Sequence, residues 1–301
     1  MTVLTDSSCF KAAFINSIML PQLQQPGKVI LAGAGTGDPD LITIKAVRYL
    51  QQADIILTDR LVSKEILTRY ANPLAEIIPV GKQCRRGIST PQKTINELLI
   101  EFAKQGKLVV RLKGGDVSIF SNILDELQAL KAHNIPFEII PGVTAALGAA
   151  AYTGIPLTAR DHATAVRLLT FYKSTVVTED YWKELSQTDD TLVFYMSSET
   201  LDDVVKKLTD NHIAADKLLA VVEQATTPFQ KVYISNLYEY NTTLKNKTYI
   251  SPSLVIIGKV VNLHQEFSWF TSNNQESEYY FKPLTGSGYI LDIKNENILV
   301  A

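Results

Sequence analysis

Two glycine-rich segments in the first half of the chain have the composition of ligand-binding loops. Residues 33–39 read Gly-Ala-Gly-Thr-Gly-Asp-Pro, and residues 111–116 end in Gly-Gly-Asp; each segment follows an apolar run. Glycine lets a ligand approach the main chain closely, and open α/β sheets bind ligands at the carboxyl ends of their strands. A tight turn with a capping aspartate would explain the first loop equally well. The occurrence of two such loops favours a ligand site.

The first loop does not suit a dinucleotide. Its spacing is G-x-G-x-G, so the third glycine of the G-x-G-x-x-G fingerprint is missing, although Asp59 stands where a ribose carboxylate would be expected. Asp38 and Asp40 flank the start of the next helix, where they would repel a pyrophosphate. The sequence therefore favours a ligand without phosphate, and a nucleotide-dependent oxidoreductase is the less favoured alternative.

A third candidate segment is residues 141–146, Pro-Gly-Val-Thr-Ala-Ala. Main-chain N–H groups and the Thr144 hydroxyl at a helix start can bind a carboxylate or the edge of an adenine. A simply capped helix is the commoner meaning of such a segment.

Strand-like and helix-like segments alternate along the chain and must position these loops. The predicted strands are residues 28–34, 53–58, 75–80, 107–112, 136–140, 166–171, 191–196, 218–223, 230–233 and 253–258. The predicted helices are residues 39–52, 63–71, 91–105, 121–133, 144–152, 179–186 and 199–211. This alternation predicts an α/β fold with a mostly parallel sheet covered on both faces.

The alternation is interrupted at Pro141-Gly142, which suggests two halves joined by an alanine-rich helix. The predicted organisation is an accessory N-terminal arm at 1–26, an N-terminal α/β domain at 27–142, a C-terminal α/β domain at 143–261 and a polar C-terminal tail at 262–301.

Composition argues against several classes of protein. A net charge of −2 gives no overall basic field for nucleic acid. No apolar run is long enough to span a bilayer, and the first twenty residues lack the positive flank and the small-residue cleavage site of a signal peptide. Two cysteines far apart in sequence predict a reduced, cytoplasmic protein without a disulfide framework. The four histidines show no ligand spacing, so no metal is predicted.

Taken in order, these motifs resemble those of the tetrapyrrole methylase family, and most nearly the uroporphyrinogen-III C-methyltransferases. The similarity covers residues 28–261 and includes both glycine loops together with residues 59–62, 80–82, 140–145, 154–158, 195–196, 223–226 and 252–258. The resemblance implies two α/β domains with S-adenosylmethionine in the cleft between them, a tetrapyrrole substrate and a homodimer.

The resemblance also implies the contacts of the site. The cofactor contacts would be Thr36, Gly114, Gly115, Asp116, Thr144, Ala145, Met196 and Ala225. The tetrapyrrole site would be lined by Asp59, Leu61, Phe120 and Tyr195, of which Asp59 and Tyr195 are the catalytic candidates. A proton must leave the substrate after methyl transfer, and Asp59 or a bound water could accept it.

The implied substrate carries many carboxylates, so cations should converge on it. Lys82, Arg85 and Arg86 form the obvious cluster. Arginine suits a bidentate grip on a carboxylate. Arg60, Lys113 and Arg160 are expected to supplement this cluster, and a solvated basic loop is the alternative interpretation.

Three departures from the family pattern concern mainly the substrate. Thr36 replaces the usual proline of the first loop, Asn122 replaces an arginine that would face the substrate, and Thr170-Phe171-Tyr172 replaces Thr-Gly-His. The resemblance implies C-methylation of uroporphyrinogen III to precorrin-2, in sirohaem or corrinoid biosynthesis. The alternatives are a methylase of another tetrapyrrole intermediate and a cofactor-binding homologue without catalysis.

Overall fold

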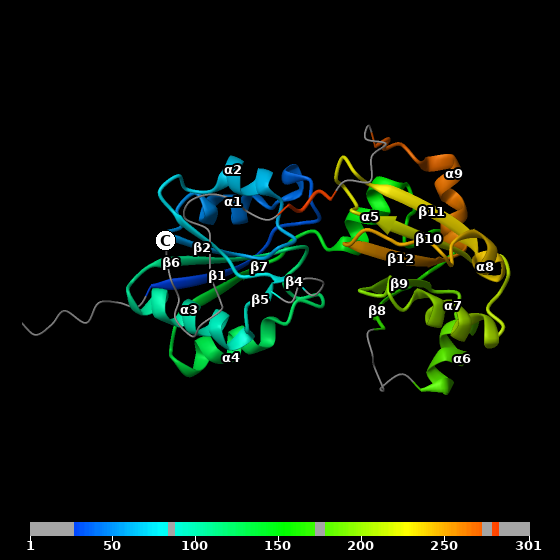
Figure 1. Cartoon of the computed structure of the whole chain (residues 1–301), viewed down its shortest axis with the longest axis horizontal. Coiled ribbons are helices and arrows are strands. Elements are labelled where there is room, and N and C mark those ends of the chain that lie inside the picture. Colours follow the sequence, from blue (N-terminus) through cyan, green and yellow to red (C-terminus); the bar gives the residue numbers. More distant parts are fainter. Residues whose placement is uncertain (1–26, 84–87, 172–177, 273–278, 283–301) are drawn as a thin grey trace, which may run out of the picture.

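The structure is a computed structural model that describes residues 27–83, 88–171, 178–272 and 279–282. Two five-stranded sheets, one from each half of the sequence, lie side by side (Figure 1). The chain passes from the first half to the second between β7 (Phe137–Ile140) and α5 (Ala145–Thr153). None of the helices in the described ranges is both long and apolar enough to cross a membrane.

The first sheet is wholly parallel. Its order is β3 (Glu76–Pro79), β2 (Ile55–Thr58), β6 (Leu108–Lys113), β1 (Lys28–Gly33) and β7. Successive side chains of a strand point to opposite faces, so a strand between two helical layers is apolar throughout. Ile30 and Ala32 of β1 accordingly pack into one core, and Val29 and Leu31 into the other.

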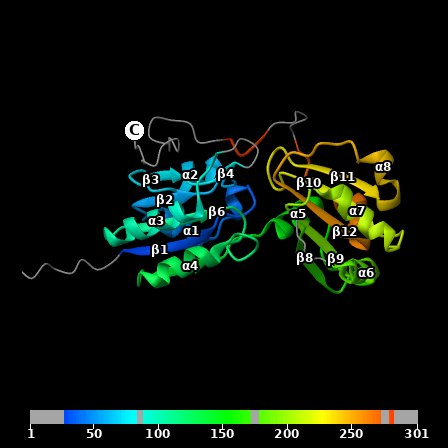
Figure 2. The same cartoon turned by 60° about the horizontal axis from the view of Figure 1, so that its bottom comes forward.

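Helices cover both faces of this sheet (Figures 1 and 2). One core includes residues of α1 (Ile44–Leu50) and α2 (Lys64–Tyr70), and the other includes residues of α3 (Gln92–Lys104) and α4 (Ile123–Ala132). The sequence predicted one continuous helix over 39–52. The structure divides it into η1 (Pro39–Leu41) and α1, because Asp38 caps the first and Thr43 caps the second.

The second sheet is mostly antiparallel, which differs from the predicted mostly parallel sheet. Only β8 (Val166–Thr170) and β9 (Thr191–Tyr195) pair in parallel. The order is β11 (Lys231–Asn236), β10 (Leu218–Glu223), β12 (Ser253–Gly258), β9 and β8. The connection between β10 and β11, residues 224–230, is too short for a crossover helix, so the chain turns back on itself.

Two helical layers also enclose the second sheet. Trp182 of α6 (Glu179–Gln187) and residues of α7 (Leu201–Asp210) pack on one face, and α5 with η3 (Lys259–Leu263) packs on the other. The sequence did not predict the following short elements: β4 (Lys82–Gln83), β5 (Ile88–Ser89), η2 (Leu237–Glu239), α8 (Tyr240–Thr243), η3 and α9 (His264–Phe267).

Candidate functional site

The two glycine loops meet because they follow neighbouring parallel strands, β1 and β6. The N–H of Gly35 donates to the carbonyl of Gly115 at 3.1 Å, and the N–H of Gly115 donates to the carbonyl of Gly35 at 2.7 Å. Both glycines have positive φ, +78° and +70°, which other residues rarely adopt. Their identity as glycine therefore has a direct structural cause.

The segment after β7 joins the same contact. A Cβ on Gly142 would stand 2.3 Å from the carbonyl oxygen of Gly115, so no larger residue fits there. The Asp116 carboxylate accepts the N–H of Gly142 at 2.9 Å with Oδ2 and the N–H of Ser118 at 2.7 Å with Oδ1. We call Gly33, Gly35, Gly115 and Gly142 the loop junction; Asp116 stabilises it.

Gly115 has few neighbouring atoms on the side where a Cβ would stand. A Cβ placed on Gly115 would have a single non-adjacent atom within 4 Å, the main-chain nitrogen of Ala145 at 3.9 Å. Ala145 is the first residue of α5, where N–H groups of the first turn have no partner within the helix. The main-chain N–H of Ala145 therefore lies beside this position, where it could donate to a polar ligand.

Tyr195, at the end of β9, anchors the start of α5. Its hydroxyl lies 2.7 Å from the Thr144 hydroxyl and accepts the N–H of Ala146 at 3.0 Å. Burial raises the pKa of Tyr195 above its ordinary value. The Phe120 ring lies 5.0 Å from the Tyr195 ring, and Phe120 is 42% exposed. Two predicted site residues, Phe120 and Thr144, thus contact Tyr195, and Ala145 lies between Thr144 and Ala146, the two residues that the Tyr195 hydroxyl contacts.

Met196 follows Tyr195 and is 54% exposed with a φ of +54°. A large apolar side chain held in the left-handed region is uncommon and indicates a constrained position. Phe120 has a φ of +50° and shares this feature. Both side chains are therefore presented outward from constrained main chain beside Tyr195.

Thr36 connects the first glycine loop to the second half of the chain. Its hydroxyl lies 3.0 Å from that of Thr226, which also accepts the N–H of Asp38 at 3.1 Å. A Cβ on Gly148 of α5 would stand 2.5 Å from the Thr36 hydroxyl, so the glycine allows this approach. Ala225, a predicted cofactor contact, is the residue before Thr226.

Asp38 serves as a structural group, as the capping alternative foresaw. Its Oδ1 accepts the N–H of Asp40, and its Oδ2 accepts the hydroxyl of Tyr152 at 2.5 Å. Burial, together with the hydrogen bond to Asp38, raises the pKa of Tyr152 to about 12. Tyr152 lies on α5, so this bond is a second link between the halves that the sequence did not reveal.

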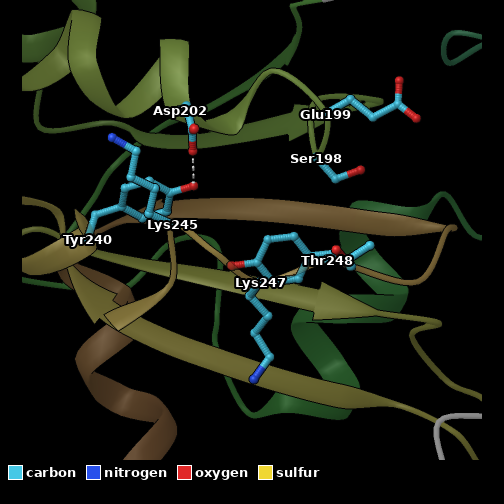
Figure 3. A pocket seen from close by; sticks show the side chains of 8 residues that line it. Ser198, Glu199, Asp202, Tyr240, Lys245, Lys247 and Thr248 are labelled. Atoms are coloured by element: carbon cyan, nitrogen blue, oxygen red, sulfur yellow. Dashed lines mark hydrogen bonds between the residues drawn. The ribbon is translucent and has the colours of Figure 1, made fainter. Parts of the chain in front are cut away.

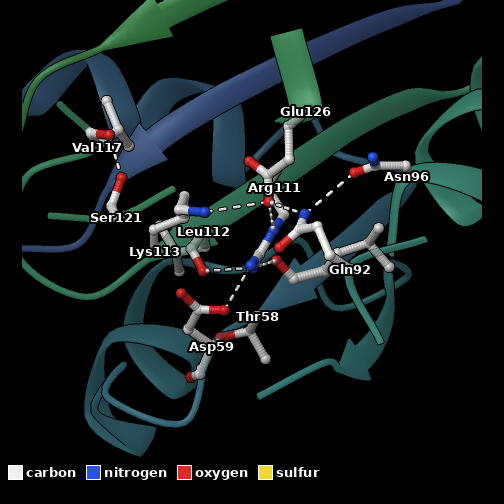
Figure 4. Close-up of polar contacts among 11 residues, drawn as sticks. Thr58, Asp59, Gln92, Asn96, Arg111, Leu112, Lys113, Val117, Ser121 and Glu126 are labelled. Atoms are coloured by element: carbon white, nitrogen blue, oxygen red, sulfur yellow. Dashed lines mark hydrogen bonds and ion pairs between the residues drawn. The ribbon is translucent and has the colours of Figure 1, made fainter. Parts of the chain in front are cut away.

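A second part of the site is built from charges (Figure 4). Arg111 of β6, only 2% exposed, donates to Asp59 Oδ1 at 2.5 Å and to Glu126 Oε1 at 3.0 Å. Lys113 donates to the same Glu126 oxygen at 3.1 Å. We call Asp59, Arg111, Lys113 and Glu126 the charged cluster. Its two cations and two carboxylates balance, as buried charges require.

Asp59 is the one member of the charged cluster with substantial exposure. Its side chain is 30% exposed, whereas the other three are 4% or less. Within the described ranges, its Oδ2 accepts no hydrogen bond, while Oδ1 is held by Arg111. Asp59 therefore presents one carboxylate oxygen outward from a fixed position.

Burial and the opposing charges act on the two cations differently. Burial disfavours the charge of Arg111, but Asp59 and Glu126 outweigh it and the pKa of Arg111 is raised. Burial, followed by the positive charge of Arg111, lowers the pKa of Lys113. The sequence had assigned Lys113 to a cluster that faces the substrate. That assignment is wrong, since Lys113 is buried and bound to Glu126.

The remaining predicted residues of the substrate site are in three different situations. Leu61 packs on Gly114, where a Cβ would stand 2.8 Å from the Leu61 Cβ, so Gly114 is needed for this contact. Lys82 lies in β4, which pairs with β5. Arg85 and Arg86 lie outside the described residues.

A separate pocket of about 230 Å³ lies in the second half (Figure 3). It is lined by Ser198, Glu199, Asp202, Tyr240, Lys245, Lys247, Thr248 and Tyr249. Tyr240 donates to Asp202 at 2.5 Å within it. None of the predicted site residues lines this pocket. Across the described ranges, no group of three or more metal-ligating side chains is found.

Comparison with protein families identifies the chain. The model of the tetrapyrrole (corrin/porphyrin) methylases matches residues 28–241. The chain belongs to the tetrapyrrole methylase family. The predicted family and the predicted α/β fold are confirmed by this match and by the structural neighbours.

Curated relatives of this tetrapyrrole methylase include several siroheme synthases. That of Pseudomonas fluorescens is 44% identical over 245 residues, which cover 81% of this chain and 52% of the relative. That of Vesicomyosocius okutanii is 42% identical over 246 residues, or 82% of this chain and 52% of the relative. The chain thus spans about half the length of the curated relatives it matches.

This chain matches nearly the whole length of several methylases whose structures have been solved. Uroporphyrin-III C-methyltransferase from Thermus thermophilus has a TM-score of 0.67 and 33% identity, covering 81% of this chain and 98% of that one. A structure of the same enzyme complexed with S-adenosyl homocysteine has a TM-score of 0.65 and 33% identity, covering 79% and 100%. Cobalt precorrin-4 methyltransferase has a TM-score of 0.68 and 27% identity, covering 78% and 95%.

Proposed function

We propose that the chain is an S-adenosylmethionine-dependent methyltransferase that C-methylates uroporphyrinogen III to precorrin-2. The observation that carries this proposal is the open position beside Gly115, where an added Cβ would meet no atom nearer than the main-chain nitrogen of Ala145 at the start of α5, at 3.9 Å. The similarity to a methyltransferase that binds S-adenosyl homocysteine, at 33% identity over its full length, supports the same ligand for this space.

In this proposal the cofactor contacts are Thr36, Gly114, Gly115, Asp116, Thr144, Ala145, Met196 and Ala225. Bound S-adenosylmethionine would supply a methyl group already activated by its sulfonium. The protein then needs chiefly to position the reactants and exclude water. Tyr195 contributes by fixing Thr144 and the first turn of α5 through its hydroxyl.

Asp59 is the proposed acceptor of the proton that the tetrapyrrole loses elsewhere in the ring after methyl transfer, because transfer from the sulfonium leaves the methylated pyrrole cationic. Arg111 holds its Oδ1, so Oδ2 faces the acceptor side without a competing bond from the described part of the chain. Leu61 and Phe120 line the proposed tetrapyrrole site, and Lys82, Arg85 and Arg86 are proposed to bind its carboxylates. We further propose a homodimer, a cytoplasmic location and domain boundaries of 27–142 and 143–261.

A second candidate is methylation of another tetrapyrrole intermediate. Two observations favour keeping it: the TM-score of 0.68 to cobalt precorrin-4 methyltransferase, and Asn122 in place of the arginine expected to face the substrate. Asn122 has a φ of +56° and precedes α4, so its main chain is constrained there.

The test is an anaerobic incubation of the purified chain with S-adenosylmethionine and enzymatically made uroporphyrinogen III. We expect a red-shifted product whose mass has increased by whole methyl groups. Binding of S-adenosyl homocysteine without any methylated product would remove the proposed substrate and leave the second candidate or a non-catalytic homologue. A matched reaction with Asp59→Asn controls for methylation that does not depend on the site.

A further inference from the structure

Residues 279–282, close to the C-terminal end, lie against both halves of the chain, and we call them the strap. They form the orange-red segment between the two sheets (Figure 1). The main-chain N–H of Tyr280 donates to Gln224 Oε1 at 2.8 Å, on the loop after β10. The Tyr280 hydroxyl donates to Glu65 Oε2 at 2.9 Å, on α2. One residue of the strap is thus bonded to both halves.

Phe281 packs the strap against the first glycine loop. It is only 2% exposed, and its Cζ would lie 3.5 Å from a Cβ placed on Gly37. The same position on Gly37 would be 2.6 Å from Thr227 Cγ2, so the loop lies between the strap and the second half. A buried aromatic ring at this point holds the loop from its outer side.

Tyr279 makes a third contact, with the substrate side. Its ring lies 5.6 Å from the guanidinium carbon of Arg60, within the range of a cation–π interaction. The rings of Tyr280 and Phe281 lie 5.2 Å apart in an edge-to-face arrangement, which makes the strap a packed unit.

The contacts of the strap share one property. Gly37 follows Thr36, Gln224 precedes Ala225, and Arg60 lies between Asp59 and Leu61. The strap therefore touches the sequence neighbours of proposed cofactor and substrate residues from both halves. It lies well beyond residue 241, where the family match ends, so it is an addition to the matched part of the fold.

The chain that leads to the strap is tied to the same loop. The indole N–H of Trp269 donates to the carbonyl of Ala151 at 2.7 Å, and the Trp269 and Phe270 rings lie 5.2 and 5.0 Å from the Tyr152 ring. Tyr152 in turn donates to Asp38 of the glycine loop. Residues 269–270, through Tyr152, and the strap, through Phe281, thus both stabilise the first glycine loop.

We propose that the strap is a positioning element that holds the first glycine loop and the loop after β10 in the arrangement that binds the cofactor. This inference rests on the proposed function. A loop that is ordered before the ligand arrives loses less conformational entropy on binding, so the affinity is higher. Phe281 is the main positioning residue, and Tyr280 joins the halves through Glu65 and Gln224.

The test compares Phe281→Ala and Tyr280→Phe with the unmodified chain, using calorimetry with S-adenosyl homocysteine. We expect Phe281→Ala to weaken binding about tenfold, the scale set by the ordering of a few side chains and one loop. Tyr280→Phe removes the hydrogen bonds of the hydroxyl with Glu65 and Ser63 and keeps the ring, and we expect about a threefold loss, within the range for one or two hydrogen bonds.

The matched control is Tyr238→Phe. Tyr238 donates its hydroxyl to the carbonyl of Ile213, in the second half and away from the strap, so its removal should leave the affinity unchanged. Amide hydrogen exchange gives a readout that needs no ligand. The N–H groups of Gly35 and Asp38 should exchange faster in Phe281→Ala, because their loop is no longer held.

Unchanged affinity and unchanged exchange in both strap variants would overturn the inference, and so would tighter binding, which would make the strap a competitor of the cofactor. If Phe281→Ala does not fold, Tyr280→Phe and Glu65→Gln decide the matter by the same two measurements. If the unmodified chain binds no S-adenosyl homocysteine, the proposed function fails, and the strap's role in cofactor binding fails with it, whatever the exchange rates show.

Discussion

The loop junction lies at the carboxyl ends of β1, β6 and β7 and is formed by main-chain contacts among glycines. The adjoining charged cluster is formed instead by side chains of β6, of α4 and of Asp59, the residue after β2. The junction depends on shape, because a Cβ on Gly142 would stand 2.3 Å from the carbonyl oxygen of Gly115. The cluster depends on charge, because Arg111 and Glu126 are almost fully buried. One site thus combines two kinds of constraint.

The difference shows what each part tolerates. A main-chain junction has no charge to lose, so it is sensitive to the volume of a residue and not to its polarity. A buried charged cluster is sensitive to the loss of any one member, since the others are left without compensation. We therefore expect the loop junction to be destabilised by added volume and the charged cluster by the loss of a charge.

The largest effect is expected for Glu126→Ala. It leaves Lys113 without its carboxylate partner and Arg111 with Asp59 as its only carboxylate among the described residues, so the free energy of unfolding should fall by about 3–5 kcal/mol. Chemical denaturation measures this change. The control is Glu97→Ala, whose carboxylate is 59% exposed and paired with Lys93; its effect should stay below about 1 kcal/mol. Similar losses in both variants would contradict a cluster based on buried charge.

Asp59→Asn tests the chemical role of the cluster without changing its volume. The amide oxygen can still accept from Arg111, but the group no longer takes up a proton, so kcat for methyl transfer should fall at least about 100-fold. The affinity for S-adenosyl homocysteine should not change. A loss of cofactor affinity equal to the loss of kcat would show that Asp59 supports the fold of the site instead of the reaction.

Gly142→Ala and Gly115→Ala separate packing from binding within the loop junction. The Cβ at 142 has no space, so this variant should lose about 1–3 kcal/mol of stability. The Cβ at 115 enters open space, at a positive φ of +70° that costs about 1–2 kcal/mol. For the same loss of stability, Gly115→Ala should therefore lose more affinity for S-adenosyl homocysteine than Gly142→Ala. A larger loss of affinity in Gly142→Ala would contradict the proposal that the cofactor binds beside Gly115.

The smallest effect is expected for Tyr195→Phe, which leaves the buried N–H of Ala146 without its acceptor and should cost about 1 kcal/mol. Burial raises the pKa of Tyr195 above its ordinary 10.0, so its hydroxyl contributes fully below pH 10.0, and this contribution is lost as the pH rises through the raised value. The difference in stability between the two proteins should shrink accordingly. A difference that is constant up to strongly alkaline pH would contradict this assignment.

The sequence alone was sufficient for the five strands of the first sheet and for the family. Each predicted strand of that sheet is present within one or two residues, because apolar runs between glycine and proline have few other conformations. The glycine loops were also visible, since their residue types are set by main-chain geometry that is local. The order of the motifs along the chain then identified the tetrapyrrole methylases.

What the sequence did not determine was which distant residues meet. Arg111 lies in the predicted strand 107–112, but its pairing with Glu126 and Asp59 depends on how α4 and β2 pack against β6. The direction of the second sheet and the strap's contacts with Gly37 and Gln224 likewise arose only in the tertiary structure. Main-chain conformation is dictated by neighbours in sequence, whereas charge pairing and strand order are dictated by neighbours in space.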